Sequence, residues 1–222
     1  MADRPILFSA PMVRALLEGR KTQTRRALKI RGHRSFSEFG PSDTRGYDWH
    51  FRDAAMRWHD LRNMELVKRL SHAIGDRLWV RETWASIDDL LFRPDNIIYR
   101  ADPNDGWEHG WRPSIFMPRW ASRLTLIVTD VRVQRLQDIS EEDAIAEGVV
   151  WYEKLSGFVV PGVDHPNPDF LVLSRPTARE MYAALWDTIN GSGAWLANPW
   201  VAAYTFTAHR KNIDQMGASH AD

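Results

Sequence analysis

Short strand-like segments separated by turns, with few helices between them, constrain the fold of this chain more than any other feature. Alternating or β-branched patterns mark the segments Ile6–Phe8, Arg77–Trp84, Ile97–Arg100, Arg123–Val133 and Trp200–Thr207. They do not follow the repeated strand–helix–strand order that a doubly wound parallel sheet requires. The pattern therefore predicts an α+β fold, built on a small mixed β-barrel with flanking helices.

Three helices are expected beside these strands. Each begins at a serine or threonine suited to an N-cap and ends at a glycine, and the three segments are Ser9–Gly19, Ser140–Gly148 and Thr177–Gly191. A fourth helix-like stretch is expected near Asp53–Leu70.

The length of 222 residues and the apolar content of 44% provide enough material for one core. We therefore expect a single domain over residues 1–210, with insertions at about 29–71 and 149–175, where the helical and strand patterns weaken. Residues 211–222 are small and polar, which predicts a flexible tail.

Charge and cysteine content exclude several classes of protein. The 29 basic and 29 acidic residues cancel, so the whole-chain charge does not favour a non-specific polyanion binder or a membrane-surface protein. There is no cysteine, which excludes disulfides, thiolate zinc sites and cysteine nucleophiles and fits a cytoplasmic protein. The sequence has no apolar run long enough to predict a signal peptide or a membrane span.

The segment Arg14–Arg34 is strongly basic, with eight lysines or arginines and one acidic residue, Glu18. Such a segment could attract a phosphate-bearing ligand, or it could be a solvated face around a helix end. Within it, Lys21 and Thr24 lie three residues apart. A lysine whose pKa is lowered by burial and cationic neighbours can activate a threonine hydroxyl as a nucleophile, although such pairs are also common without any catalytic role.

Two carboxylates, Glu147 and Glu82, each allow a functional and a purely structural interpretation. Glu147 lies at the far end of an acidic helix, where the helix dipole disfavours it, so we expect either a nearby lysine or an exposed side chain. Glu82 lies on the apolar face of a strand, where it would either pair with an arginine or accept a hydrogen bond from a substrate.

Aromatic and histidine residues suggest little chemistry by themselves. Eleven tryptophans are many for this length, and some of them, such as Trp84, lie in or beside predicted loops, where they could stack on a base or simply pack. The eight histidines are scattered without a metal-ligand spacing, so no metal site is expected. No nucleotide-binding glycine motif is present, and no cofactor is expected.

The octapeptide Gly19–Arg26, with the sequence GRKTQTRR, resembles the G-x-K-x-x-T-x-R signature of the ASCH-domain family. The segments Gly75–Leu78 and Ile139–Gly148 are similar to further family motifs, in the expected order. The chain also resembles the longer ASCH proteins of phages and prophages, through Pro5–Ser9, Arg81–Trp84 and Met117–Ser122.

This resemblance implies a PUA-like barrel and two kinds of function. One branch of the family consists of amidohydrolases that deacylate N(4)-acetylcytidine, with a lysine base, a threonine nucleophile and a glutamate acid. These roles fall on Lys21, Thr24 and Glu147. Arg26 would then stabilise the oxyanion, as the backbone amides after Gly19 also could.

Three further residues are candidates for substrate binding. Trp84 or Tyr99 would stack on the pyrimidine, and Glu82 would read a polar edge. The substrate is accordingly expected to be a small modified nucleoside.

The competing hypothesis is a binding module that recognises RNA or a modified base through the basic segment and exposed tryptophans, without cleavage. The chain is about twice as long as the compact amidohydrolases that it resembles. Its two insertions have no counterpart there, and they could cover the pocket and change its substrate.

Overall fold

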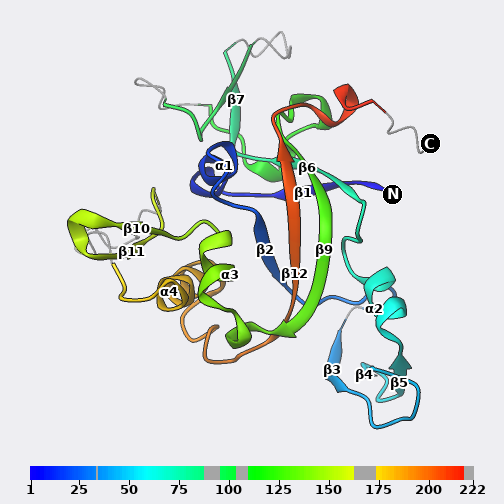
Figure 1. The fold of residues 1–222 in the computed structure, drawn as a ribbon. Coiled ribbons are helices and arrows are strands. Elements are labelled where there is room, and N and C mark those ends of the chain that lie inside the picture. The colour runs from blue at the N-terminus through cyan, green and yellow to red at the C-terminus, as the bar shows by residue number, and fades with distance from the viewer. Residues whose placement is uncertain (34, 88–95, 104–109, 163–173, 218–222) are drawn as a thin grey trace.

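The computed structural model describes residues 1–33, 35–87, 96–103, 110–162 and 174–217. Within them, twelve strands form several sheets and four α-helices accompany them (Figure 1). The expected α+β class is therefore confirmed.

A curved sheet of five strands forms the centre of the molecule. Its order is β1 (Asp3–Leu7), β6 (Arg77–Arg81), β9 (Thr125–Arg135), β12 (Trp200–His209) and β2 (Gln23–Ala27). The pair β1–β6 is parallel, and the other neighbours are antiparallel. Each of the segments predicted to be a strand contributes to this sheet or to a hairpin beside it.

The two edges of this sheet approach each other at one end. Arg26 Nη2, on β2, donates a hydrogen bond of 2.7 Å to the carbonyl oxygen of Leu7, at the end of β1. In the described part of the chain no backbone ladder joins these two strands. The side chain of Arg26 thus bridges the two edge strands, β1 and β2. A closed barrel stays a prediction.

Three helices lie on one side of the sheet in Figure 1: α1 (Ala10–Leu17), α3 (Glu141–Ala146) and α4 (Ala178–Asn190). They correspond to the three helices that the sequence predicts. Ser140 and Thr177 cap α3 and α4, since their side-chain oxygens accept hydrogen bonds from backbone N–H groups three residues later.

The first insertion contains an antiparallel sheet of its own, followed by a helix. The strands are β3 (Phe36–Pro41), β4 (Trp49–Asp53) and β5 (Trp58–Leu61), and the helix is α2 (Asn63–Arg69). The expectation of a helix-like stretch over Asp53–Leu70 was therefore wrong for its first half. The Asp53 carboxylate accepts hydrogen bonds from the N–H groups of the next turn, which favours a hairpin there.

The two ends of this insertion lie side by side. Arg31 N donates to the carbonyl oxygen of Arg69 at 2.8 Å, and Arg31 Nε donates to that of Leu70 at 2.7 Å. Phe39 and Trp49 both pack against Trp200 of β12, with ring centroids 5.3 and 5.5 Å from it. The insertion is thus anchored to the main sheet through an aromatic cluster.

Two short hairpins complete the fold. The predicted strand Arg77–Trp84 is interrupted at Glu82, and its end begins β7 (Trp84–Ser86), which pairs with β8 (Ile97–Tyr99). In the second insertion, β10 (Val150–Tyr152) pairs with β11 (Gly157–Val159). Short 3₁₀ turns lie at Ser114–Phe116, Arg119–Ala121, Leu136–Asp138, Glu153–Leu155 and Ile213–Gln215.

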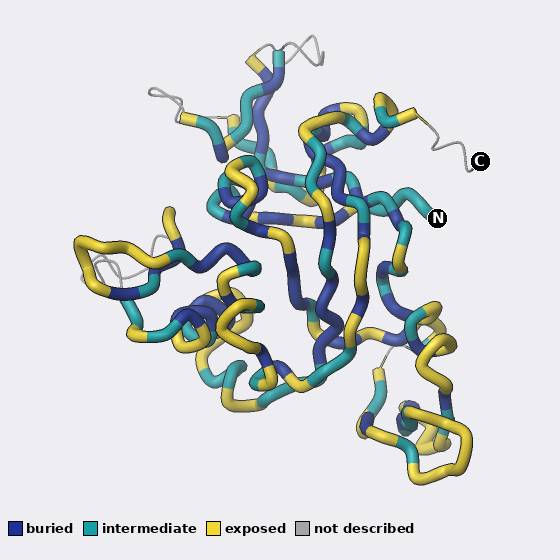
Figure 2. The backbone as a smooth tube through the Cα atoms, in the orientation of Figure 1, coloured by how far each residue is buried: buried dark blue, intermediate teal, exposed yellow. Residues whose placement is uncertain are grey.

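The buried residues lie mainly along the central sheet and the inner faces of its helices, whereas exposed residues gather on the outer hairpins (Figure 2). The first part of the predicted tail belongs to the packed structure, because Ile213 is fully buried and Arg77 Nη1 donates to the carbonyl oxygen of Met216. Residues 218–222 of that tail lie outside the described residues. None of the described helices combines the length and apolar character needed to cross a membrane.

Candidate active site

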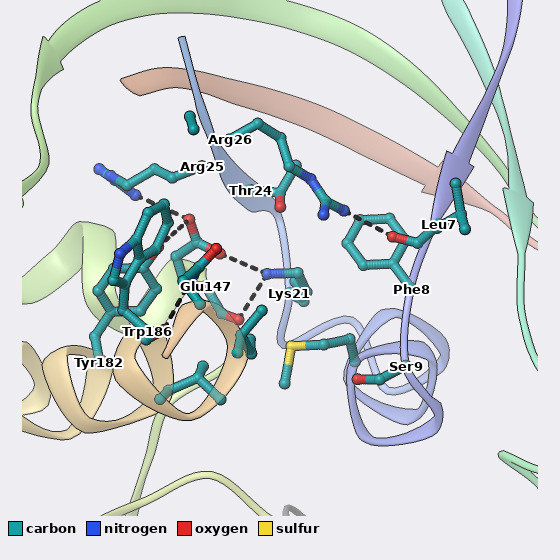
Figure 3. A pocket seen from close by; sticks show the side chains of 15 residues that line it. Leu7, Phe8, Ser9, Lys21, Thr24, Arg25, Arg26, Glu147, Tyr182 and Trp186 are labelled. Carbon is teal, nitrogen blue, oxygen red and sulfur yellow. Dashed lines mark hydrogen bonds and ion pairs between the residues drawn. The ribbon is translucent and has the colours of Figure 1, made fainter. Parts of the chain in front are cut away.

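A pocket of about 180 Å³ opens between the ends of β1 and α3, strand β2 and helices α1 and α4. This volume is well above the roughly 10–15 Å³ that one water molecule needs. Four residues singled out in the sequence line the pocket together: Lys21, Thr24, Arg26 and Glu147 (Figure 3).

Lys21 and Glu147 form a buried ion pair at the base of the pocket. Lys21 Nζ lies 2.6 Å from Glu147 Oε2 and donates a second hydrogen bond, of 2.9 Å, to the carbonyl oxygen of Glu147. The exposed fractions of the two residues are 2% and 3%. Of the two alternatives expected for Glu147, the structure therefore has the nearby lysine, which lies 126 residues away along the chain.

Arg25 and Tyr182 hold the other oxygen of this carboxylate. Arg25 Nη1 lies 3.2 Å from Glu147 Oε1, and the hydroxyl of Tyr182 donates to the same oxygen at 3.4 Å. Arg25 Nη2 also pairs with Asp143 Oδ2 at 2.6 Å. Contacts with two cationic side chains stabilise the Glu147 carboxylate and fix its orientation.

The surroundings of Lys21 change its acid–base behaviour. Burial lowers the pKa of Lys21 below its ordinary value, Glu147 opposes this effect, and the charges of Arg26 and Arg25 lower the pKa further. Moving one proton from Nζ to Oε2 across the 2.6 Å contact converts the ion pair into a neutral amine and a neutral acid. The pair can thus supply a base and an acid together, without a change of net charge.

Thr24 lies on β2, where it pairs with Tyr204 of β12, and it is 4% exposed. Figure 3 shows its hydroxyl directed into the pocket, between the Lys21 amine and the Arg26 guanidinium in that view. Among the described residues, none forms a hydrogen bond with this hydroxyl. It is accordingly available to a ligand in the pocket.

The alternation of side chains along β2 separates its two arginines. Arg25 points toward α3 and its carboxylates, whereas Arg26 points toward the end of β1, where it bonds to Leu7 and lies 5.2 Å from the centroid of Phe8. Burial lowers the pKa of Arg26 from its usual value, but an arginine remains charged at neutral pH. Arg26 therefore brings a fixed positive charge to the mouth of the pocket.

A tight contact between the loop after α1 and the end of α3 brings Lys21 to Glu147. The N–H of Thr22 donates to the carbonyl oxygen of Ala146 at 2.8 Å, and Glu147 is the last residue before Gly148. Gly148 has a φ of +106°, and a Cβ there would lie 3.3 Å from Ala15 Cβ. Glycine at this position both ends the helix and permits the close approach.

The other three predicted binding residues lie elsewhere. Glu82 is 1% exposed and forms a two-pronged ion pair with Arg123, at 2.9 and 3.0 Å. Trp84 packs in a small apolar cluster with Ile97 and Met117, against which Tyr99 also packs. None of Glu82, Trp84 and Tyr99 lines the pocket that holds Lys21 and Thr24.

Burial raises the pKa of Glu82, and it also raises the pKa of Tyr99, to about 12. The hydroxyl of Tyr99 donates to the carbonyl oxygen of Ala121 at 2.9 Å, and the Arg123 guanidinium lies 3.9 Å from its ring centroid. Arg123 therefore contacts Glu82 and Tyr99 at once and links the two residues in a polar cluster apart from the pocket.

Sequence reasoning did not identify Arg25, Tyr182 and Trp186 as site residues, although all three line the pocket. The charges of the segment Arg20–Arg26 suggested exposure, yet Arg25 is 3% exposed because Glu147 and Asp143 neutralise it. Tyr182 and Trp186 belong to the buried stripe of α4, where a pocket-facing aromatic residue cannot be distinguished from a core residue by spacing alone.

Among the described residues, the pocket lining contains a single carboxylate, Glu147, and no histidine, so these residues offer no metal-ligand set. Comparisons of the chain with family models, with curated proteins and with solved structures found no match.

Proposed function

We propose that this protein is a metal-independent amidohydrolase that deacylates N(4)-acetylcytidine or a related N(4)-acylated cytidine. The observation that carries this proposal is the buried Lys21–Glu147 pair in one pocket with the unbonded hydroxyl of Thr24. The likeness of Gly19–Arg26 to the ASCH signature supports the same assignment.

The first half of the reaction transfers the acyl group to the enzyme. Lys21, as the neutral amine, takes the proton of Thr24, and the Thr24 oxygen forms a bond to the acyl carbon. The carbonyl oxygen becomes an oxyanion, which Arg26 would stabilise. The bond between carbon and N4 then breaks, and Glu147, as the acid, protonates the departing amine of cytidine.

The second half restores the enzyme. The carboxylate of Glu147 takes a proton from water, whose oxygen attacks the acyl-threonine ester. When that ester bond breaks, the protonated Lys21 returns its proton to the Thr24 oxygen. Lys21 and Glu147 are then again an amine and an acid, and the products are cytidine and a carboxylic acid.

The pocket also suits a flat heterocycle. The aromatic side chains of Phe8, Tyr182 and Trp186 line it, and they would contact a pyrimidine more directly than the expected Trp84 or Tyr99. We assign the stacking role to this set. A small modified nucleoside is the substrate that the volume favours.

The proposal includes a PUA-like barrel as the finer fold of the central sheet. A mixed five-stranded sheet whose edges meet at Leu7 and Arg26 is compatible with an open PUA-like barrel of the ASCH type, as found in the longer phage and prophage proteins. The cytoplasm remains the proposed location, supported by the lack of cysteine.

The alternative of an RNA-binding module is less well supported by the basic segment. Among its described cations, Arg20, Lys21 and Arg25 form ion pairs inside the protein, and Arg14, Arg26 and Arg31 donate to backbone carbonyl oxygens. The ion pairs neutralise part of the charge on which binding to a phosphate backbone depends.

The decisive experiment is turnover of N(4)-acetylcytidine in the presence of EDTA, followed by cytidine release. We expect the wild-type protein and Thr24→Ser to release cytidine, whereas Thr24→Val, which keeps the shape but removes the hydroxyl, does not. Thr22→Val is the matched control, because Thr22 is exposed and two residues away, and it should behave as the wild type.

Two outcomes would contradict the proposal. Equal turnover by Thr24→Val and the wild type would exclude Thr24 as the nucleophile. Absence of turnover on acetyl and bulkier acyl cytidines, together with salt-dependent RNA affinity that Lys21→Ala weakens, would establish the binding module instead.

A further inference from the structure

Three potential metal ligands come together in the first insertion. A nitrogen of His33, a carboxylate oxygen of Asp53 and a nitrogen of His59 all lie within 4.8 Å of one another. Asp53 is 4% exposed, and the two histidines are half-buried. Figure 1 shows the β3–β5 sheet well apart from α1 and α4, which border the candidate active site.

The hairpin of β4 and β5 places two of these ligands on one face. Phe51 and Asp53 are two residues apart on β4 and so share a face, and His59 of β5 is the cross-strand partner of Phe51. His59 Nε2 lies 2.9 Å from Asp53 Oδ2. The third ligand, His33, comes from the loop before β3, so two separate segments supply the set.

The Asp53 carboxylate is oriented before any ion arrives. Its Oδ1 accepts hydrogen bonds from the N–H groups of Ala55 at 2.9 Å and Arg57 at 3.0 Å, which leaves Oδ2 facing His59. Hydrogen bonds of this kind, outside the ligand atoms themselves, orient metal ligands in known sites.

The two imidazole rings are also held in place. His59 stacks on Phe51 with centroids 4.7 Å apart and planes 12° apart, and the His33 ring meets Phe51 edge-on at 4.7 Å. Phe51 is fully buried, so it forms a rigid apolar wall behind both rings.

We propose that His33, Asp53 and His59 bind one divalent transition-metal ion of the zinc type. Two histidines and one carboxylate match the ligands that zinc takes, with a fourth position left for water. In a tetrahedral site with bonds of about 2.0 Å, ligand atoms lie about 3.3 Å apart. The 2.9 Å contact of His59 and Asp53 needs only a small opening, and the ion takes the place of the proton between them. The other ligand atoms, within 4.8 Å of one another, need to close by up to about 1.5 Å.

Arg57 would compete with the ion for the Asp53 carboxylate. Its guanidinium lies 3.0 Å from Asp53 Oδ2, but its side chain is 72% exposed and can turn into solvent. The site would fasten the loop before β3 to the β4–β5 hairpin. This inference does not depend on the proposed amidohydrolase activity.

The test is a titration of the untagged full chain, stripped with EDTA and dialysed, with Co²⁺ followed by Zn²⁺. We expect one Co²⁺ per chain with the visible absorption of a tetrahedral nitrogen and oxygen site, displacement by Zn²⁺, and a rise in Tm with Zn²⁺. His59→Ala and His33→Ala should each lower the affinity at least about tenfold. His50→Ala is the matched control, because His50 lies on the opposite face of β4, and it should bind as the wild type.

A second variant, Arg57→Gln, tests the metal site while it keeps all three ligands. Because it removes a cation from Asp53, it should raise the Zn²⁺ affinity several-fold. The proposal is overturned if the wild type binds no stoichiometric Co²⁺ or Zn²⁺, or if Arg57→Gln and the histidine variants bind as the wild type does.

Discussion

Lys21 Nζ donates one hydrogen bond to the carboxylate of Glu147 and another to its backbone carbonyl, so both acceptors belong to the same residue. The carboxylate contact is 2.6 Å and the carbonyl contact is 2.9 Å. This arrangement joins the loop after α1 to the end of α3, and it links the stability of the fold to the chemistry of the pocket.

Breaking this pair on one side should destabilise the protein strongly. Glu147→Leu leaves the buried cations Lys21 and Arg25 without this partner, and the expected cost is about 3–5 kcal/mol of unfolding free energy. Adding Lys21→Met to Glu147→Leu should recover part of this loss. Urea unfolding of both single variants and the double variant measures the coupling, and strictly additive costs would exclude a direct interaction.

The pH dependence of turnover should report Lys21. The reacting form of the Lys21–Glu147 pair holds one proton, as a neutral amine and a neutral acid, and burial lowers the pKa of Lys21. We therefore expect kcat/KM to fall as rising pH removes this proton, through a midpoint below 10.5. Arg26→Gln removes a charge that lowers this pKa, so the midpoint should move to higher pH. The pH–rate profiles of the wild type and Arg26→Gln test this expectation, and an unmoved midpoint would show that the falling limb belongs to another group.

His72 should make the fold sensitive to acid. Burial, with the charge of Arg4 next, lowers its pKa to about 4, whereas Asp76 acts in the opposite direction. The unfolded chain then binds more protons than the folded chain between about pH 6.5 and 4, so stability falls as the pH drops through this window. The loss is on the order of 2–3 kcal/mol.

His72→Phe should flatten this pH dependence. The ring of His72 meets Tyr204 edge-on at 5.1 Å, its Nδ1 has no hydrogen-bond partner, and phenylalanine preserves the shape. The difference in unfolding free energy between the variant and the wild type, measured from pH 7 to pH 4, isolates this residue. A constant difference over that range would exclude His72 as the titrating group.

Glu82 should matter for stability and not for substrate binding. Arg123→Met would leave Glu82 buried without this ion pair, at a cost of about 3 kcal/mol or more. Because neither residue lines the pocket, the KM for an acylated cytidine should not change in protein that remains folded. An increase in KM under conditions where circular dichroism shows a native fold would return Glu82 to the substrate site.

The sequence was most informative where the chemistry is local. The place of Glu147 at a helix end, where the dipole disfavours it, left a lysine partner and an exposed side chain as alternatives, and the structure contains the lysine. Helix caps at Ser140 and Thr177 were likewise predicted, because an N-cap depends on residues within one turn.

It was least informative where distant segments meet. The strands β3–β5 are short, and their order depends on pairing that no periodicity encodes, so part of this region was taken for a helix. For the same reason the approach of His33 to Asp53 and His59 could not be seen, because spacing along the chain does not measure distance across a hairpin.

The two ends of the first insertion meet at Arg31 and Arg69. The segment between them therefore begins and ends at one point of the remaining fold. In topological terms it is a removable module, because its absence would require a junction of only a few residues and would break no strand pairing of the five-stranded sheet. Removing this module would expose the aromatic contact at Trp200 and the part of the hydrophobic core that the module covers.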